Sequence, residues 1–326
     1  MTPPAQIESH KRRPRSWLSE VPIPMPYIAL AILVAMVTTQ RPSYLSVAQL
    51  NLTTLEAFSL ILVTVGQTIV ILSGGLDLSV GGVINLTTVL AATQFGRGGA
   101  HMVVWILLLL LLGLAIGAVN GAVVRRLRMQ PFVVTLATWS ILSGVSLLIL
   151  PTPGGQIPAS WLSFGNMTVG GLSIWVMGLA GIAVFWVSFT RRPLGRAIKA
   201  LGSNSEAAYL AGVRVAPTVV GAYALCGLFA AACGLFLTTQ TGGGSPIIGN
   251  DFVLPSVAAT AIGGTRLTGG FASLAGAIAG AYVLTVINDV VFTFGIPQAW
   301  SIVLSGLLLV MAVFLGELRG LLHRWA

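Results

Sequence analysis

Charged residues are scarce in this chain of 326 residues. Lys, Arg, Asp and Glu together make up 8% of it, whereas hydrophobic residues make up 56% and the mean hydropathy is +0.93. Soluble domains carry roughly one-quarter charged residues, so this composition excludes a soluble globular protein and predicts an all-α protein that crosses a membrane many times. At about 20 residues per span, the length accommodates roughly nine to eleven helices. We therefore expect residues 1–326 to form a single transmembrane domain.

Lysine, histidine and cysteine are also rare, and each scarcity excludes a class of chemistry. The lysines are Lys11 and Lys199, and neither lies in a glycine-rich phosphate loop, so the chain has no Walker A motif and is not itself an ATPase. No His/Cys cluster, carboxylate series or nucleophile arrangement is present, so we expect no enzyme, metal site, cofactor or proton relay. Cys226 and Cys233 are expected about 10 Å apart along one helix, too far for a disulfide.

Apolar runs between charged or turn-forming residues predict ten spans. Their approximate cores are residues 21–39, 55–73, 78–95, 102–124, 132–150, 172–189, 217–239, 252–263, 270–290 and 297–315. The eighth run is too short to cross about 30 Å as an ordinary helix. It either crosses in another form or makes a re-entrant half helix that is supported by protein.

The distribution of cations orients the spans. With ten crossings and the N-terminus inside, 15 of the 17 Lys and Arg residues fall on the cytoplasmic side, and Arg41 and Arg97 lie outside. A re-entrant eighth span would move Arg266 and the C-terminal arginines outside, so the positive-inside rule favours ten crossings. Both termini, an N-terminal tail of residues 1–20 and a loop of residues 190–216 are then cytoplasmic. The net charge of +9 is explained by these flanking cations, without a nucleic-acid partner.

Residues 202–213, with the sequence GSNSEAAYLAGV, form a polar segment inside the basic loop. Ser203 and Glu206 have capping-box spacing, Ala207 and Ala208 give a small-residue face, and Gly212 stands where a glycine ends a helix. This pattern predicts a helix of about two turns that docks on a soluble partner. The residues expected to form this contact are Gly202, Asn204, Glu206, Ala207, Ala208 and Gly212.

Two glycine-rich segments echo one another, GGLDLSVGGVINL from Gly74 and GGTRLTGGFASL from Gly263. Paired glycines allow broken backbone, which is tolerated in a membrane only against protein or a water-filled cavity. They either line a transport pathway or let helices pack. Asp77 and Arg266 occupy corresponding places in the echoes. Asp77 is interpreted as an N-cap of the following helix, a gating or partner-facing group, or a solute contact, and Thr268 as a cap of the other helix.

Neutral polar residues within the apolar runs are candidates for a hydrophilic path. The candidates are Gln67, Asn85, Asn120 and Thr135, together with Thr64, Thr68 and Thr138. Each is equally consistent with an interhelical hydrogen bond. Small residues recur every four positions at Gly113, Gly117 and Gly121, and at Ala272, Gly276 and Gly280, which predicts close helix packing.

The segment at 202–213 resembles the loop by which membrane subunits of ABC importers engage their ATPase, in the form found in ribose and other monosaccharide permeases. The resemblance extends to GGLDLSVGG, NGAVVRRLRMQPFVVTLAT and AATAIGGTRLTGG, and to Asn288, within residues 45–320. It implies an ABC importer permease fold with broken or re-entrant helices at the glycine-rich turns. It also implies a bacterial inner (cytoplasmic) membrane location, a second permease copy in a homodimer or heterodimer, an ABC ATPase subunit, and a periplasmic or lipid-anchored sugar-binding protein.

The sequence leaves two alternative functions open. The related branched-chain amino acid permeases share the architecture, and an ion-coupled secondary transporter or channel would have the same composition, although it would need more intramembrane carboxylates. The chain also departs from its relatives at Val253, Leu254 and Pro255, where many carry acidic residues. Any contact at the outer face assigned to that position is therefore in doubt.

Overall fold

The computed structural model describes residues 25–297 and part of the stretch 299–314. The described positions of that stretch are 299–301, 303, 304, 306, 307, 310, 311 and 314. The tail of residues 1–20 and the C-terminal residues 315–326 therefore lie outside the described residues, and the predicted cytoplasmic placement of both termini stays a prediction.

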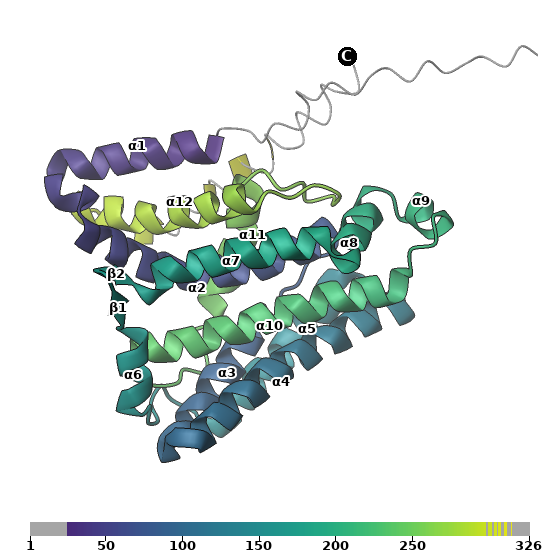
Figure 1. Cartoon of the computed structure of the whole chain (residues 1–326), viewed down its shortest axis with the longest axis horizontal. Coiled ribbons are helices and arrows are strands. Elements are labelled where there is room, and N and C mark those ends of the chain that lie inside the picture. The colour runs from purple at the N-terminus through teal and green to yellow at the C-terminus, as the bar shows by residue number, and fades with distance from the viewer. Residues whose placement is uncertain are drawn as a thin grey trace, which may run out of the picture.

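Helices dominate the chain and run roughly along one common direction (Figure 1). They are α1 (Met25–Gln40), α2 (Val47–Leu72), α3 (Val80–Gln94), α4 (Gly99–Arg126), α5 (Pro131–Ile149), α6 (Ala159–Gly165), α7 (Ile174–Arg191), α8 (Pro193–Ser203), α9 (Ser205–Leu210), α10 (Val215–Thr241), α11 (Asn250–Ile262) and α12 (Leu274–Thr293). Two short 3-10 helices, η2 (Pro42–Leu45) and η3 (Phe95–Arg97), connect them. A small hairpin of β1 (Thr168–Val169) and β2 (Leu172–Ser173) is the minor departure from an all-α fold.

Six of these helices are long and apolar enough to cross a membrane, by length and composition, within the described part of the chain: α2, α4, α5, α7, α10 and α12. The other predicted runs fall on α1, α3 and α11, which have 16, 15 and 13 residues, and on helical positions between 299 and 314. At about 1.5 Å per residue, α11 spans only about 20 Å. The chain is thus a multi-pass helical membrane protein, and the predicted total of ten crossings goes beyond what helix length alone supports.

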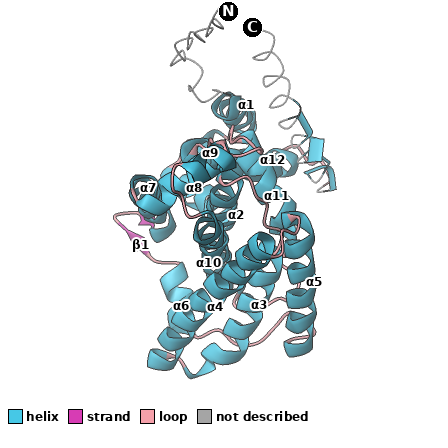
Figure 2. Ribbon diagram, turned by 90° about the vertical axis from the view of Figure 1, so that its right-hand side faces the viewer, coloured by secondary structure: helices cyan, strands magenta, loops and turns pink. Residues whose placement is uncertain are grey.

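α2 lies at the centre of the bundle. In its most apolar stretch 89% of the residues are buried, whereas in the corresponding stretches of α4 and α5 only 17% of the residues are buried. α2 packs against α7, α10, α11 and α12, while α4 and α5 lie at the edge of the bundle (Figure 2). Many, but not all, of the exposed residues of α4 and α5 are apolar. Apolar residues outside and buried polar residues inside are the arrangement that a bilayer requires of a multi-pass protein.

The two predicted small-residue stripes are helix contacts. A Cβ added at Gly117 in α4 would lie 2.0 Å from the carbonyl oxygen of Tyr223 in α10, and one added at Gly280 in α12 would lie 2.1 Å from that of Ala259 in α11. Any larger side chain would push these backbones apart. The prediction of close packing is confirmed for Gly113, Gly117 and Gly121 and for Gly276 and Gly280, whereas Ala272 precedes α12. Cys226 and Cys233, both buried and free, lie in the same helix α10 as predicted.

The described cations gather at one end of the bundle, which we name the basic end. Arg125 and Arg126 close α4, Arg191 closes α7, and Arg214 precedes α10. Arg128, Arg192, Arg196, Lys199 and Arg266 also belong to it. Arg41 lies at the opposite end, between α1 and η2 (Figure 1). The helix ends therefore reproduce the charge asymmetry that the sequence predicted.

Two spans are broken, because each consists of a non-helical segment followed by a short helix. We name residues 73–79, before α3, the first break and residues 242–249, before α11, the second break. α2 ends at the basic end, and residues 73–79 then lead to α3 without forming a helix. From the opposite end, residues 242–249 run along α3 before α11 begins: the Thr88 hydroxyl donates to the Ser245 carbonyl at 2.9 Å, and the Gly249 amide donates to Asn85 at 2.6 Å. Residues 242–249 are thereby paired with α3, as a membrane demands of non-helical backbone.

The two breaks meet where α3 and α11 begin. A Cβ added at Gly249 would lie 2.1 Å from the carbonyl oxygen of Gly81, so only glycine permits this approach. The predicted break at the Gly74 echo is present. The second break lies at residues 242–249 instead of at the Gly263 echo, which forms the loop that joins α11 to α12 at the basic end.

Candidate functional site

The basic loop folds into two consecutive helices, α8 and α9, at the basic end. The Asn204 side chain accepts a hydrogen bond from the Ala207 amide at 2.9 Å and caps α9. The predicted Ser203–Glu206 capping box is wrong, because Ser203 is the last residue of α8 and its hydroxyl donates to the Lys199 carbonyl at 2.9 Å. An asparagine directly after α8 both ends one helix and begins the next.

Gly212 ends α9 as predicted. Its φ is +83°, and the Gly212 and Val213 amides donate to the carbonyls of Tyr209 and Ala208 at 2.9 and 3.0 Å. These two bonds form a Schellman motif, which needs a left-handed residue at this place.

The exposed surface of α9 differs from the prediction at one residue. Ala208 is only 4% exposed and faces the chain's own interior, so it does not belong to an outward docking face. Ala207 and Glu206 are exposed, and Tyr209 and Leu210 are 68% and 78% exposed. Tyr209 and Leu210 are thus the large apolar side chains that the described basic loop exposes most.

Gly202 of α8 contacts the end of α2 and the second glycine echo. A Cβ added at Gly202 would lie 1.9 Å from the carbonyl oxygen of Leu72 and 2.6 Å from the amide nitrogen of Gly270. The Gly270 amide in turn donates to the Leu72 carbonyl at 3.0 Å, and a Cβ added at Gly269 would lie 2.9 Å from the amide nitrogen of Gly74. We name this contact of Gly74, Gly202, Gly269 and Gly270 the glycine junction. It places the loop helices directly on the end of α2 and on the start of the first break.

Asp77 lies in the first break and is fully buried. One of its carboxylate oxygens accepts hydrogen bonds from the Ser79 amide and hydroxyl at 2.9 and 2.6 Å. Asp77 is therefore not the N-cap of α3, which begins after Ser79, but closes a turn just before it. Thr268 does not cap α12 either, because the Ser273 hydroxyl accepts from the Gly276 amide at 3.1 Å.

Asn120 of α4 continues the network from Asp77. Its amide donates to the Ser79 hydroxyl at 2.8 Å, and its carbonyl accepts from the Thr138 hydroxyl of α5 at 2.6 Å. The chain Asp77, Ser79, Asn120 and Thr138 thus ties the first break to α4 and α5. For Asn120, the structure shows the interhelical hydrogen bonds that the sequence offered as one alternative.

Asn85 holds the second break against α3. Its amide donates to the side-chain oxygen of Asn250 at 3.2 Å, and its own oxygen receives the Gly249 amide. The same Asn250 oxygen also accepts from the Trp139 indole at 3.0 Å. These bonds tie the start of α11 to α3 and to α5.

Of the other candidate residues, Gln67 and Thr135 are enclosed and Arg266 is exposed. Gln67 is fully buried, its oxygen lies 3.9 Å from the Cys226 thiol, and its amide nitrogen has no partner. Thr135 bonds back to the Pro131 carbonyl of its own helix at 2.9 Å. Arg266 is exposed at the basic end, with its guanidinium 5.7 Å from the centre of the Phe271 ring. In this conformation Gln67 and Thr135 contribute no open path.

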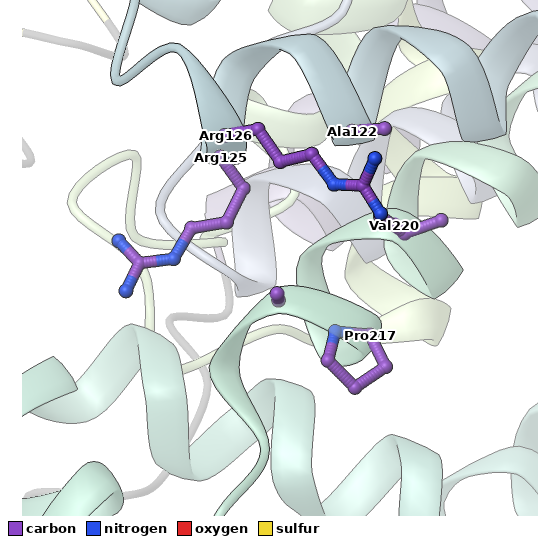
Figure 3. Close-up of a pocket in the computed structure, with 6 residues that line it drawn as sticks. Ala122, Arg125, Arg126, Pro217 and Val220 are labelled. Atoms are coloured by element: carbon purple, nitrogen blue, oxygen red, sulfur yellow. The ribbon is translucent and has the colours of Figure 1, made fainter.

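A shallow pocket of about 360 Å³ lies beside the basic loop, where α4 ends and α10 begins. It is lined by Ala122, Arg125, Arg126, Ala216, Pro217 and Val220. The Arg126 side chain reaches toward Val220, while the Arg125 guanidinium extends away from it (Figure 3). Within the described residues no group of three His, Cys, Asp or Glu is placed to hold a metal.

At the opposite end of the bundle, a hydrogen bond joins η2 to α12. The Tyr44 hydroxyl donates to Asp289 at 2.5 Å, and the Arg41 guanidinium lies 5.1 Å from the centre of the Phe292 ring. Burial and the neighbouring Asp289 raise the pKa of Tyr44 above its ordinary value, so this hydroxyl stays protonated as the donor. Asp289 thus has a protein partner at the far end of its helix.

Trp139, Ser79, Asn250 and Asp251 are site residues that sequence reasoning missed. Only Ser79 lies within a glycine echo. The other three residues belong to no motif, and the pairing of Trp139 with Asn250 joins positions that are 111 residues apart. The available signal was Asn250–Asp251 itself, two polar residues directly before the short eighth run. A polar pair beside an apolar run too short to span is a sign of a broken helix.

A multi-pass helical membrane protein whose broken spans meet inside the bundle has the architecture of a transport protein. The chain belongs to the permease family described as "Branched-chain amino acid transport system / permease component", whose model matches residues 50–313. Members of this family are permease subunits and not enzymes. No solved structure matches the chain.

The relatives found by sequence are named for sugar import. Ribose import permease protein RbsC of Escherichia coli K12 is 31% identical over 308 residues, covering 92% of this chain and 94% of the relative. Ribose import permease protein RbsC of Bacillus subtilis 168 is 32% identical, covering 89% and 91%. Galactose/methyl galactoside import permease protein MglC of Salmonella typhimurium LT2 is 30% identical, covering 93% and 96%. The resemblance inferred from the four sequence motifs is confirmed.

Proposed function

We propose that this chain is the membrane subunit of an ATP-driven ABC importer that moves a monosaccharide or a related small polar solute. Its location would be the bacterial inner membrane, with the basic end and both termini in the cytoplasm. The ATP hydrolysis would come from a separate ATPase subunit, and a periplasmic or lipid-anchored binding protein would deliver the solute. A second permease copy, identical or related, would complete the pathway.

The glycine junction is the observation that carries this proposal. An importer permease needs a rigid contact between the partner-facing loop and the membrane spans, because ATPase closure must be passed on as a displacement. Here Gly202 of α8 touches the end of α2 and the Gly270 loop at backbone distance, with no side chain between them to absorb the movement. A shift of α8 would therefore move residues 73–79 and the start of α12 together.

The exposed tip of α9 is the proposed contact with the ATPase. Tyr209 and Leu210 present apolar surface, and Glu206 and Ala207 lie exposed beside them. Gly202, Asn204, Ala208 and Gly212 would act differently from the initial expectation, by shaping the loop and not by touching the partner. A small rigid helix with two large apolar anchors fits a groove on a soluble partner.

A sugar is favoured over a branched-chain amino acid. The family description names amino acid transport, but the full-length relatives compared above carry the names of ribose and galactose permeases. An ion-coupled transporter is disfavoured because Asp77 is the one fully buried carboxylate among the described residues, and ion coupling relies on several.

Reconstitution tests the proposal. The chain, co-expressed with its ATPase and binding-protein partners, is placed in proteoliposomes with ATP enclosed on the ATPase side. We expect radiolabelled ribose or galactose uptake that requires ATP and binding protein and that persists when ion gradients are collapsed. Uptake that needs a proton or sodium gradient, with no ATP requirement, would overturn the proposal.

A further inference from the structure

An exposed acid lies near the middle of the bundle. Asp251 follows Asn250, whose side chain is bonded to Trp139, and Trp139 is the ninth of nineteen residues in α5. At 1.5 Å per residue, Trp139 lies roughly 12 to 15 Å from either end of that helix. Asp251 is exposed, as is Asn250, and no described residue is placed to pair with its carboxylate.

Lipid cannot solvate the exposed surface around Asp251. A carboxylate at the depth of the bilayer centre faces a protein interior or a water-filled cavity, because hydrocarbon cannot solvate it. Asp251 lies in the first turn of α11, where the helix dipole stabilises a negative charge. The dipole does not explain why this carboxylate is exposed at this depth. The edge faces of α4 differ, because their exposed residues at similar depth are apolar, such as Leu107 and Leu111.

The α5–α11 face, where Trp139 of α5 meets Asn250 at the start of α11, carries further polar groups. Trp139 is partly exposed with its indole N–H held by Asn250, and Ser140 and Ser143 lie on the same helix, exposed and partly exposed. An indole ring bonded to an amide oxygen, with a carboxylate on the next residue of α11, suits a neutral polyhydroxylated solute. The ring covers the apolar face of a sugar, and the oxygens accept hydrogen bonds from its hydroxyls.

We propose that the α5–α11 face lines the water-filled solute pathway, and that Trp139, Asn250 and Asp251 contact a neutral sugar at mid-depth. This inference rests on the proposed function and deepens it by naming the wall of the pathway. The second permease copy supplies the opposite wall. The meeting of the two breaks behind this wall lets movement at the glycine junction reach the contact residues through residues 73–79.

Water access is the first test. Asp251→Cys is made in the full transporter in proteoliposomes and treated with a charged methanethiosulfonate, which reacts with a hydrated thiolate. Leu111→Cys, 59% exposed on α4, is the matched control at similar depth, and the wild-type chain gives the background because both its cysteines are buried. Leu254→Cys, 63% exposed and one turn further along α11, serves if the first variant fails to assemble.

We expect the α11 cysteines to react at least about ten-fold faster than Leu111→Cys, because thiolate formation needs water. Equal, slow reaction at both places would mean that lipid or a tightly packed second copy covers this face, and it would overturn the inference.

Solute contact is the second test. Trp139→Leu and Asp251→Asn are compared with Leu111→Ala for uptake of radiolabelled ribose and galactose, and for ATP hydrolysis stimulated by the binding protein. We expect the two variants to lower uptake about ten-fold while stimulated hydrolysis stays within about two-fold of wild type.

Unchanged uptake in both variants, with an active wild type, would overturn the inference alone. Absence of ATP-dependent uptake in the wild type would overturn the proposed function itself, so the two failures are distinguishable.

Discussion

The amide of Gly270 donates a hydrogen bond to the carbonyl of Leu72 at 3.0 Å, across 198 positions of the chain. Leu72 is the last residue of α2, and its carbonyl would otherwise be one of the unpaired groups that a helix leaves at its end. The bond joins the end of α2 to the second glycine echo at the basic end, and Gly202 of α8 lies directly against it.

Substitution at the glycine junction should be costly. Gly202→Ala places a methyl group 1.9 Å from the Leu72 oxygen, so α8 must shift, and we expect a loss of about 1–3 kcal/mol. Gly181→Ala on α7 is the matched control, because its added methyl group meets nothing within 4 Å and alanine favours helix by up to about 1 kcal/mol. Thermal unfolding in detergent measures both. Equal stability of the two variants would contradict the close contact.

The cap of α9 is assigned to Asn204 and not to Ser203. Asn204→Ala removes the oxygen that receives the Ala207 amide, and we expect it to cost about 1 kcal/mol of local stability. Ser203→Ala should cost less, because its hydroxyl only bonds back within α8. Hydrogen exchange at residues 205–210 measures the effect. Faster exchange in Ser203→Ala than in Asn204→Ala would restore the capping box.

Leu210 should anchor the ATPase. Leu210→Asp puts a charge where apolar surface is expected to be buried, so we expect at least about a ten-fold loss of ATPase co-purification, with unchanged stability of the membrane part. Leu45→Asp is the control, because Leu45 is 71% exposed at the opposite end of the bundle. If both variants retain the ATPase equally, the tip of α9 is not the contact.

Asp77 should act through its hydrogen bonds. Asp77→Asn keeps an oxygen for the Ser79 amide and hydroxyl, so we expect near-normal uptake. Asp77→Ala leaves a buried donor unpaired, which costs about 1–3 kcal/mol. Unfolding and sugar uptake are measured for both. Loss of uptake in a well-folded Asp77→Asn transporter would show that the negative charge itself is needed.

The orientation of the chain is tested at the basic loop. Ser205→Cys lies at the exposed start of α9, and the two native cysteines are buried. We expect an impermeant thiol reagent to label it only in inside-out vesicles, because cations favour the cytoplasmic side. Labelling in intact cells would invert the topology.

The sequence by itself determined the class of protein, the positions of the helices and the charged end. Apolar runs and flanking arginines are local properties, so the described parts of the predicted runs coincide largely with helices, including the helical positions between 299 and 314. Gly212 could be assigned from its neighbours alone, because a helix stop depends on a few adjacent residues. The small-residue stripes at Gly117 and Gly280 also follow from spacing along one helix.

Only the tertiary structure decided which distant residues meet. The capping box at Ser203 failed because α8 continues to that residue, and the docking face lost Ala208 because the chain's own packing covers it. The contact of Gly202 with Leu72, and of Asn250 with Trp139, joins separate elements whose approach no local pattern encodes. Backbone hydrogen bonds of a broken span must be satisfied by whatever protein lies beside it, and that neighbour is set by the packing of the whole bundle.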